Sequence, residues 1–229
     1  MAAPENPQTI ILKNKFYPRG LKEIDVWKYY QSYKGKILNE TRGRDIMFAI
    51  MTDINKPVIK RKSPSGKFVQ LTNATYDKYM TGRTLVVYST MKDYEDIAIV
   101  DIDVDNFTRA KEAAINLHDV MFNAPFVRTA EIRYTGKQSF HIFCKLPRKI
   151  KIDSIRFLLE KHIRGTDLLN KYTMLHKRQP GIPNIDLSIN KHRGAFITLG
   201  SLSLFGLKCT EIPFNRISGF TPSHALIKT

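Results

Sequence analysis

The stretch IAIVDIDVD, residues 97–105, decides the fold and carries the clearest chemistry of the chain. Its first four residues are apolar, which predicts a strand buried on both faces. Side chains alternate between the two faces of a strand, so Asp101 and Asp103 point to the same side. Two like charges held side by side are costly unless a cation lies between them. A divalent metal with oxygen ligands suits this pair, and the plainer alternative is a strand that runs out into an acidic turn.

The chain is strongly basic. Lys and Arg number 37 against 21 Asp and Glu among 229 residues, which gives a formal net charge of +16. This balance indicates a polyanionic partner, and nucleic acid fits best. The basic residues are spread over strands, loops and turns instead of one amphipathic helix face, which argues against a membrane-surface role.

The sequence contains no recognisable targeting or membrane segment. No apolar run approaches the length of a membrane span, and the N-terminal MAAPENPQ lacks the apolar core of a signal peptide. We therefore expect an intracellular protein that is not secreted and has no membrane partner. The two cysteines, Cys144 and Cys209, fit a reducing compartment and have no partners at ligand spacing, so no zinc site is predicted.

The hydrophobic periods that follow Asp103 predict a regular succession of elements. They indicate a helix over 107–121, strands over 126–134 and 139–146, a helix that stops at Gly165, and a last strand over 182–189. With the strand before Asp103, this order is βαββαβ, the ferredoxin-like unit. In that unit the first and third strands are central neighbours and the fourth lies beside the first. Side chains of the third and last strands are therefore expected to flank the two aspartates.

The residues before the central strand predict a second group of elements. Asp25 is the expected N-cap of a helix that stops at Gly35, and strands are expected over 43–53 and 84–90. Between these strands, 55–71 has the pattern of a hairpin whose turn is SPSG. Its basic side chains are candidates for phosphate contacts, and a solvated surface loop is the alternative. They are Lys60, Arg61, Lys62 and Lys67.

Further candidate site residues lie on the third and last predicted strands. Ser139 and His141 are two residues apart, so they share a face, where they either grip the phosphates of a nucleotide or form a hydrogen-bonded core pair. Asp186 offers a third carboxylate, and the basic residues Lys191 and Arg193 follow it. Three carboxylates on adjacent strands suit two divalent metals roughly 3.5 to 4 Å apart.

These motifs together resemble the archaeo-eukaryotic primase superfamily. Its signature is DxD, then SxH, then a third carboxylate after an apolar residue, read here as DID, SFH and ID in that order. The resemblance implies an α/β (α+β) chain with the archaeo-eukaryotic primase fold, forming a single catalytic domain over 1–229. Within it, the N-terminal αβ lobe is expected over 1–90, the RRM-like, ferredoxin-like βαββαβ catalytic core over 91–212, and a C-terminal tail over 213–229.

The resemblance also implies an activity and a set of roles. The activity is template-directed nucleotidyl transfer, as in primases and primase-polymerases, with DNA template and primer and NTP or dNTP as partners. Asp101, Asp103 and Asp186 would hold two Mg²⁺ or Mn²⁺ ions as the catalytic metal site. The nucleotide would be bound by Ser139, His141, Lys137, Arg193 and Lys191. The nucleic acid would be bound by Lys60, Arg61, Lys62 and Lys67, because residues 43–64 resemble the early segment of the polymerase domain of end-joining ligases.

Some features depart from the family pattern and keep alternatives open. SLSLFG, residues 201–206, stands where primase small subunits carry a basic stretch, and the zinc ligands of cellular primases are absent. Gly136-Lys137 is not a P-loop, because Gln138 follows it. A primer-dependent gap-filling or end-joining polymerase is therefore one alternative to a primase that works with a helicase or large subunit. A non-catalytic nucleic-acid-binding subunit is another, although clustered carboxylates would repel phosphate.

Overall fold

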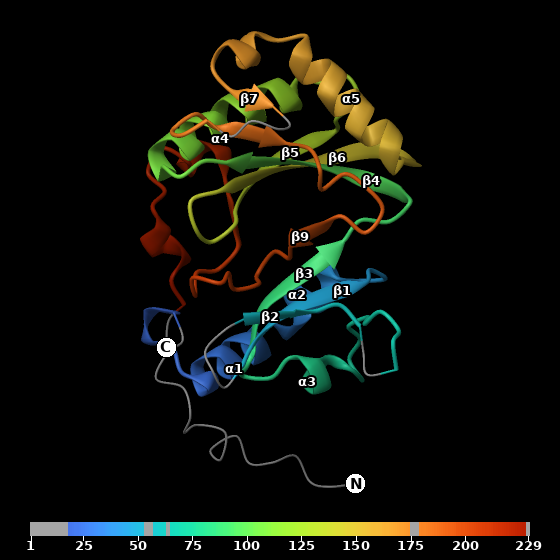
Figure 1. Cartoon of the computed structure of the whole chain (residues 1–229), viewed down its shortest axis with the longest axis vertical. Helices are drawn as coiled ribbons and strands as arrows, with labels where there is room; N and C mark the ends of the chain where they lie inside the picture. Colours follow the sequence, from blue (N-terminus) through green and yellow to red (C-terminus); the bar gives the residue numbers. More distant parts are fainter. Residues whose placement is uncertain (1–17, 53–56, 63–64, 175–178, 228–229) are drawn as a thin grey trace, which may run out of the picture. The chain divides into compact units, whose positions relative to one another are not determined.

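A computed structural model describes residues 18–52, 57–62, 65–174 and 179–227, which divide into two compact units (Figure 1). The first unit takes the described residues up to Ser89, together with 197–209 and those from Ala225 onward. The second takes 90–196 and 210–224. The structure thus divides the chain near the expected boundary at residue 90, but it places 197–209 with the first unit and not with the core.

The described residues of the first unit form a sheet with helices packed on it. The sheet has the strand order β2-β1-β3-β9, and β1 is antiparallel to both β2 and β3. The strands are β1 (Ile46–Met51), β2 (Pro57–Lys60), β3 (Thr84–Thr90) and β9 (Ala195–Ile197), although Thr90, Ala195 and Phe196 fall within the residue range of the second unit. The helices are η2 (Pro18–Gly20), α1 (Glu23–Ser32), α2 (Lys34–Glu40) and α3 (Tyr76–Tyr79). β2 is exposed along its whole length at the edge of this sheet.

The first helix begins and ends at residues other than those predicted from the sequence. Asp25 is not the N-cap but lies inside α1, where its carboxylate accepts the backbone N–H of Lys22 at 2.8 Å. This hydrogen bond satisfies a donor at the helix start, so the helix begins earlier than expected. Gly35 does not stop the helical stretch either, because α2 runs through it. The aromatic stripe is core as expected: Tyr29 and Tyr30 are buried.

Hydrogen bonds made by the hydroxyl groups of that stripe explain why 197–209 belongs to the first unit. The Tyr29 hydroxyl donates to the carbonyl of Gly200 at 2.7 Å, and the Tyr30 hydroxyl accepts the N–H of Leu202 at 3.0 Å. The Ser201 hydroxyl accepts the N–H of Val87 on β3 at 2.8 Å. All of these groups are buried, where an unsatisfied polar atom is costly. The segment therefore completes the polar contacts of the first unit's core.

The second unit contains the βαββαβ succession that the sequence predicts. Its described strands have the order β10-β5-β6-β4-β8-β7, in which β4 lies between β6 and β8 as the ferredoxin-like unit requires. The strands are β4 (Tyr94–Asp103), β5 (Thr129–Tyr134), β6 (Phe140–Lys151), β7 (Thr173–Met174), β8 (Asn184–Asp186) and β10 (Thr210–Ile212). The helices are α4 (Phe107–Phe122), α5 (Ile152–Arg164), η3 (Asp167–Asn170), η4 (Phe214–Arg216) and η5 (Pro222–Ala225).

Helices α4 and α5 cover one face of this six-stranded sheet (Figure 1). Each buries one apolar stripe at helical spacing, as expected for an amphipathic helix against a sheet. The buried side chains include Ala110, Ala114, Leu117 and Met121 on α4, and Ile155, Leu159 and Ile163 on α5. In the part of the chain that the structure describes, every helix is too short or too polar to cross a bilayer.

The strand β8 is shorter than predicted, and beyond its end one buried side-chain amide makes hydrogen bonds to the backbone of β4. β8 spans only three residues, and the chain then turns away from the sheet. Asn190 reaches back to β4: its side-chain oxygen accepts the N–H of Ile99 at 2.9 Å, and its side-chain nitrogen donates to the carbonyl of Ile99 at 2.6 Å. The same nitrogen donates to the carbonyl of Leu187 at 3.2 Å. The amide thereby replaces a strand residue beside β4.

We expect Asn190→Ala to lower the free energy of unfolding by about 2 to 4 kcal/mol, because it leaves buried backbone groups of β4 without partners. Urea unfolding monitored by circular dichroism measures the change. Asn215→Ala, which truncates an exposed asparagine, is the matched control. Equal stability of the two variants would contradict the role assigned to Asn190.

Candidate functional site

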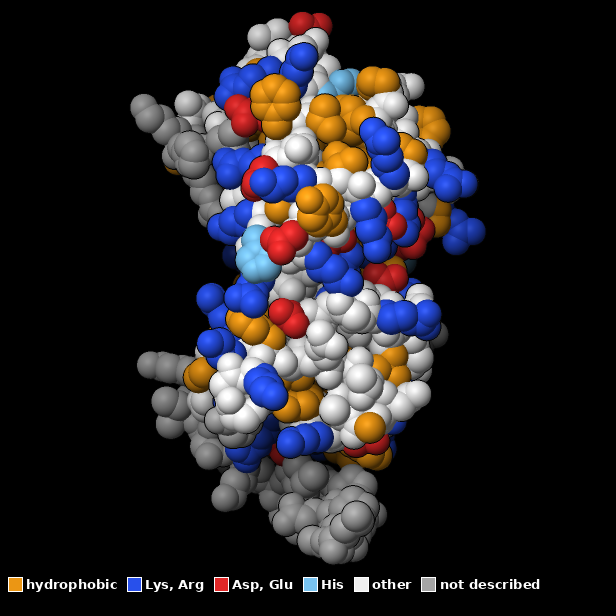
Figure 2. Space-filling model, turned by 90° about the vertical axis from the view of Figure 1, so that its right-hand side faces the viewer, with side chains coloured by type: hydrophobic (Ala, Val, Ile, Leu, Met, Phe, Trp, Pro, Cys, Tyr) orange, Lys and Arg blue, Asp and Glu red, His pale blue; other side chains and the backbone are white. Residues whose placement is uncertain are grey.

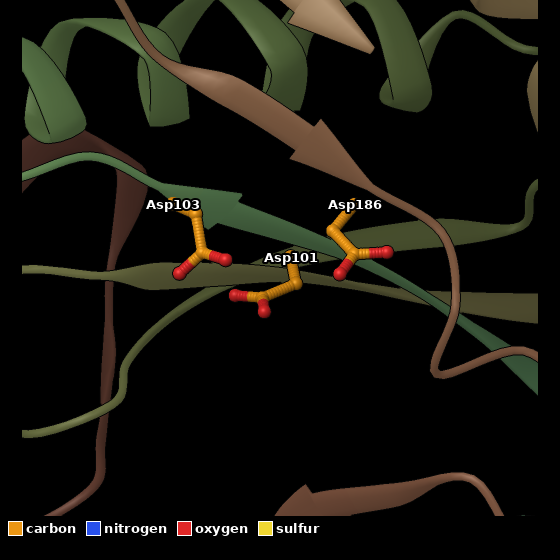
Figure 3. A group of neighbouring side chains, drawn as sticks. All are labelled: Asp101, Asp103 and Asp186. Carbon is orange, nitrogen blue, oxygen red and sulfur yellow. The ribbon is translucent and has the colours of Figure 1, made fainter. Parts of the chain in front are cut away.

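The register of β4 brings together the carboxylates that the sequence placed in one site. Asp101 lies opposite Asp186 of β8 on one side and opposite His141 of β6 on the other. Directly opposed residues of antiparallel strands share a face, with Cβ atoms about 4.5 to 5.5 Å apart. Asp103 is two residues further along β4 and joins them on the same face. Figure 3 shows the three aspartate side chains pointing to one side of the strands, away from the helices.

The three aspartates are close enough to share a cation. One carboxylate oxygen from each of Asp101, Asp103 and Asp186 lies within 4.8 Å of the others, and all three side chains are half-buried. At this separation each pair of charges repels by roughly 3 kcal/mol near a protein surface. Oxygen ligands lie about 2.1 Å from Mg²⁺, so opposite ligands are about 4.2 Å apart. Small side-chain rotations therefore suffice to fit the donor set to a hard divalent ion.

Hydrogen bonds within the second unit fix the orientation of this cluster. The Oδ1 atom of Asp186 accepts the N–H of Ser188 at 2.7 Å. The Nε2 atom of His141 lies 3.3 Å from Oδ1 of Asp101, and the imidazole is buried, with 8% of its side chain exposed. A buried imidazole beside a carboxylate limits the directions in which that carboxylate turns. The predicted proximity of His141 to the aspartates is therefore present in the structure.

The row of opposed residues continues beyond His141 to a residue that the sequence analysis missed. Arg133 of β5 lies opposite His141 and is almost fully buried. Its guanidinium stacks 3.7 Å from the ring centroid of Phe143, and Nη2 donates to Oε2 of Glu131 at 3.0 Å. Its side chain therefore places a fixed positive charge on the carboxylate face. An arginine inside a predicted strand was the available signal, because arginine is rarely buried without partners.

A pocket of about 400 Å³ adjoins the end of β4. Among its lining residues are Asp103, Lys137 and Ser139, together with Gln138 and Gln179, which the sequence analysis did not single out. The wall is held by hydrogen bonds of the β5–β6 turn. The Tyr134 hydroxyl donates to the carbonyl of Lys137 at 2.6 Å, and the Thr135 hydroxyl donates to that of Ser139 at 2.9 Å. Lys137 and Ser139 therefore share a cavity with Asp103, one of the three clustered aspartates.

Other predicted nucleotide-binding residues lie elsewhere in the second unit. Lys191 and Arg193 are exposed in the tight turn after β8, and neither is among the described residues that line the pocket. Arg193 has a positive φ of 58°, and its N–H donates to the carbonyl of Met91 at 3.0 Å. Its backbone is therefore fixed by the turn, while the side chain extends from the surface.

The basic hairpin belongs to the first unit. Its cations are exposed: Lys60 ends β2, Arg61 follows, and Lys67 comes after the turn. Lys62 forms an antiparallel bridge with Phe68, which confirms the hairpin, and its ammonium lies 5.4 Å from the Phe68 ring centroid. Residues 63–64 of the predicted turn lie outside the described residues.

Cys144 is part of the core and not of the site. It lies on β6, one residue from the face that His141 and Phe143 share, so its thiol points to the helix side. Burial, with a smaller contribution from the Glu131 carboxylate, raises the pKa of the Cys144 thiol to about 12. The thiol therefore stays protonated at neutral pH and is a poor metal ligand.

We compared the sequence and the structure with those of known proteins. No protein-family model matches the sequence, and no curated protein matches it. Among solved structures, the polymerase domain of Ligase D from Mycobacterium tuberculosis, solved in complex with DNA, superposes with a TM-score of 0.78. The two sequences are 11% identical, and the match covers 95% of this chain and 88% of that one. The chain therefore has the archaeo-eukaryotic primase fold that its motifs predicted.

Proposed function

We propose that the chain is a template-directed nucleotidyltransferase that extends or initiates a nucleic-acid strand from NTPs or dNTPs. The observation that carries this proposal is the convergence of Asp101, Asp103 and Asp186 beside a pocket that also contains Lys137 and Ser139. Cations held by the carboxylates on one side, with a lysine and a hydroxyl on the other, would suit a triphosphate because they neutralise its charge from two sides. The shared fold with a polymerase domain supports the same reading.

In this proposal the three aspartates would hold two Mg²⁺ or Mn²⁺ ions. When bound, such ions supply charge neutralisation at the phosphates and lower the pKa of the attacking hydroxyl. Asp101 is kept in orientation by the imidazole of His141, and Asp186 by the N–H of Ser188. The remaining contribution of the chain is positioning, which in phosphoryl transfer accounts for most of the catalysis.

The nucleotide phosphates are assigned to the pocket beside Asp103. Lys137 provides a point charge and Ser139 a hydroxyl, both from a turn held by Tyr134 and Thr135. His141 connects this turn to Asp101, because it lies opposite Asp101 on β6 and two residues after Ser139, which directly precedes that strand. Lys191 and Arg193 remain candidates for the outer phosphates, since both side chains are exposed after β8.

Primer use separates the two enzymatic candidates. The likeness to the polymerase domain of a ligase favours a primer-dependent gap-filling or end-joining polymerase as the second candidate. Wild-type protein should be given Mn²⁺, single-stranded template and labelled nucleotides, with and without an annealed primer. Products without primer identify a primase, a role in which we expect a helicase or large primase subunit as an intracellular partner. Products only with primer identify a repair polymerase, and DNA binding without any product would favour a non-catalytic subunit.

We expect Asp101→Asn to lower nucleotide incorporation by at least about 10³-fold, because it removes a shared metal ligand worth several kcal/mol. DNA affinity should change little. Primer extension and fluorescence anisotropy measure the two quantities. Asp119→Asn, which makes the same charge change at an exposed position of α4, is the control. Parallel loss of incorporation and DNA affinity would argue against a metal-only role.

For Lys137→Ala, we expect the KM for the nucleoside triphosphate to rise about tenfold, which is the cost of one charge-assisted phosphate contact. Steady-state incorporation at fixed primer-template measures it. Lys78→Ala removes an exposed lysine of α3 in the first unit and should leave the KM unchanged. An unaltered KM in Lys137→Ala would remove the pocket from the nucleotide site.

The double variant Lys60→Ala with Lys62→Ala should bind duplex DNA more weakly and with a smaller salt dependence. Each lost phosphate contact reduces the slope of log affinity against log salt by about 0.9. Anisotropy titrations at several salt concentrations give this slope. Lys28→Ala with Lys36→Ala removes two exposed lysines from α1 and α2 as a charge-matched control. Equal slopes in the two double variants would exclude the hairpin from the DNA footprint.

A further inference from the structure

A second nucleic-acid surface is suggested by exposed aromatic rings on the helix side of the second unit. Phe157 of α5 and Tyr94 at the start of β4 are 65% and 61% exposed. Among the described large hydrophobic residues, these are the two most exposed. The first residue of α5, Ile152, donates its N–H to the carbonyl of Asp93 at 2.9 Å, so the helix starts beside Tyr94.

The position of Phe157 on its helix shows that its exposed ring does not belong to the apolar stripe that packs on the sheet. The buried stripe of α5 is formed by Ile155, Leu159 and Ile163. At 100° per residue, Phe157 stands roughly opposite that stripe, at the centre of the solvent face. Its ring therefore adds nothing to the packing of α5 on the sheet. Single exposed apolar side chains are common on protein surfaces, and this one is distinguished by a second exposed ring, Tyr94, and by the cations near both.

Each ring has a cation close to it in the strand register or along the helix. Residues 145–164 contain seven Lys and Arg against two Asp and Glu. Lys151 lies opposite Tyr94 in the strand register, and Lys161 follows Phe157 by one helical turn. In the described part of the chain, Arg148, Lys149 and Lys161 form no ion pair. Figure 2 shows Lys and Arg side chains gathered around exposed hydrophobic ones on this side of the second unit.

We propose that Tyr94, Phe157, Arg148, Lys149, Lys151 and Lys161 form a binding surface for single-stranded nucleic acid, here called the basic-aromatic surface. Flat exposed rings stack on unpaired bases, and neighbouring cations contact the phosphates between them. A duplex offers the phosphates but covers the faces of its bases, so it engages only the cations. A strand that is unpaired therefore gains contacts on this surface that a duplex does not.

The basic-aromatic surface is separate from the carboxylate site. Tyr94 and Asp101 are seven residues apart on β4, which corresponds to roughly 23 Å at the rise of a strand. Phe157 lies on the helix layer, whereas the three aspartates lie on the other face of the sheet. Binding at this surface requires neither the metal site nor the nucleotide pocket, so it does not rest on the proposed activity.

The test is the affinity of the full chain for a fluorescein-labelled 20-nucleotide oligo(dT), in EDTA and without nucleotides. Phe157→Ala and Tyr94→Ala should each weaken binding about tenfold, the loss expected for one stacked base. Phe157→Trp should retain the affinity, and Phe157→Leu should lose it, because leucine is apolar but cannot stack. The same variants should bind a blunt dA·dT duplex as wild type does. Unchanged thermal melting shows that the variants are folded.

Phe205→Ala is the matched control, because Phe205 is a 43% exposed aromatic residue that belongs to the first unit and not to the second. It should leave oligo(dT) affinity unchanged. Wild-type affinity in both Phe157→Ala and Tyr94→Ala would overturn the proposal. Full affinity in Phe157→Leu would overturn it in favour of a general apolar contact. Repeating the titrations in Asp101→Asn protein separates the two proposals, since loss of activity must leave the aromatic effect intact.

Discussion

The antiparallel pairing of β4 with β6 and β8 is the constraint on which the candidate site depends. It sets Asp101 opposite His141 on one strand and opposite Asp186 on the other. Side chains alternate with a period of two, so a slip of one residue in either pairing would send a partner to the helix face. The four apolar residues before Asp101 oppose such a slip, because all of them are buried, whichever face of β4 they point to. The hydrophobic core thus fixes the positions of the polar site.

The same pairing concentrates charge in a way that folding alone does not favour. Three carboxylates within 4.8 Å repel one another. His141 lies beside Asp101, and Arg133, paired with Glu131, lies one strand further away on the same face. Hydrogen bonds from Ser188 and the contact with His141 hold individual carboxylates in place without removing their charge. A divalent cation held among the three carboxylates would relieve this repulsion.

Much of this site could be predicted from sequence, because its residues follow strict strand periodicity. The alternation in 97–105 placed Asp101 and Asp103 on one face, and the βαββαβ order placed Asp186 and His141 beside them. The family resemblance, rather than periodicity, supplied the roles. Arg133 was missed because its burial depends on stacking against Phe143 of another strand, a contact that no local pattern shows. Its pairing with Glu131, two residues earlier on the same strand, does follow the strand period.

The errors in the predicted fold have similar causes. Gly35 was expected to stop a helix, but its conformation is compatible with α2, so local propensity was overridden. The last strand was predicted too long because the apolar residues after Asp186 continue the pattern, whereas the chain turns and Asn190 takes over the contact with β4. Residues 197–209 were assigned to the core, since sequence order gave no sign that Tyr29 and Tyr30 bind them.

The return of 197–209 to the first unit makes both units discontinuous in sequence. Neither is complete before the last quarter of the chain has been synthesised, because Asp186 reaches Asp101 across 85 residues and Ser201 reaches β3 still later. Contacts of such high sequence separation close large loops, which slows folding. A chain emerging from the ribosome therefore cannot finish one unit before starting the other. The acidic cluster is assembled only after β8 has been synthesised and has paired with β4.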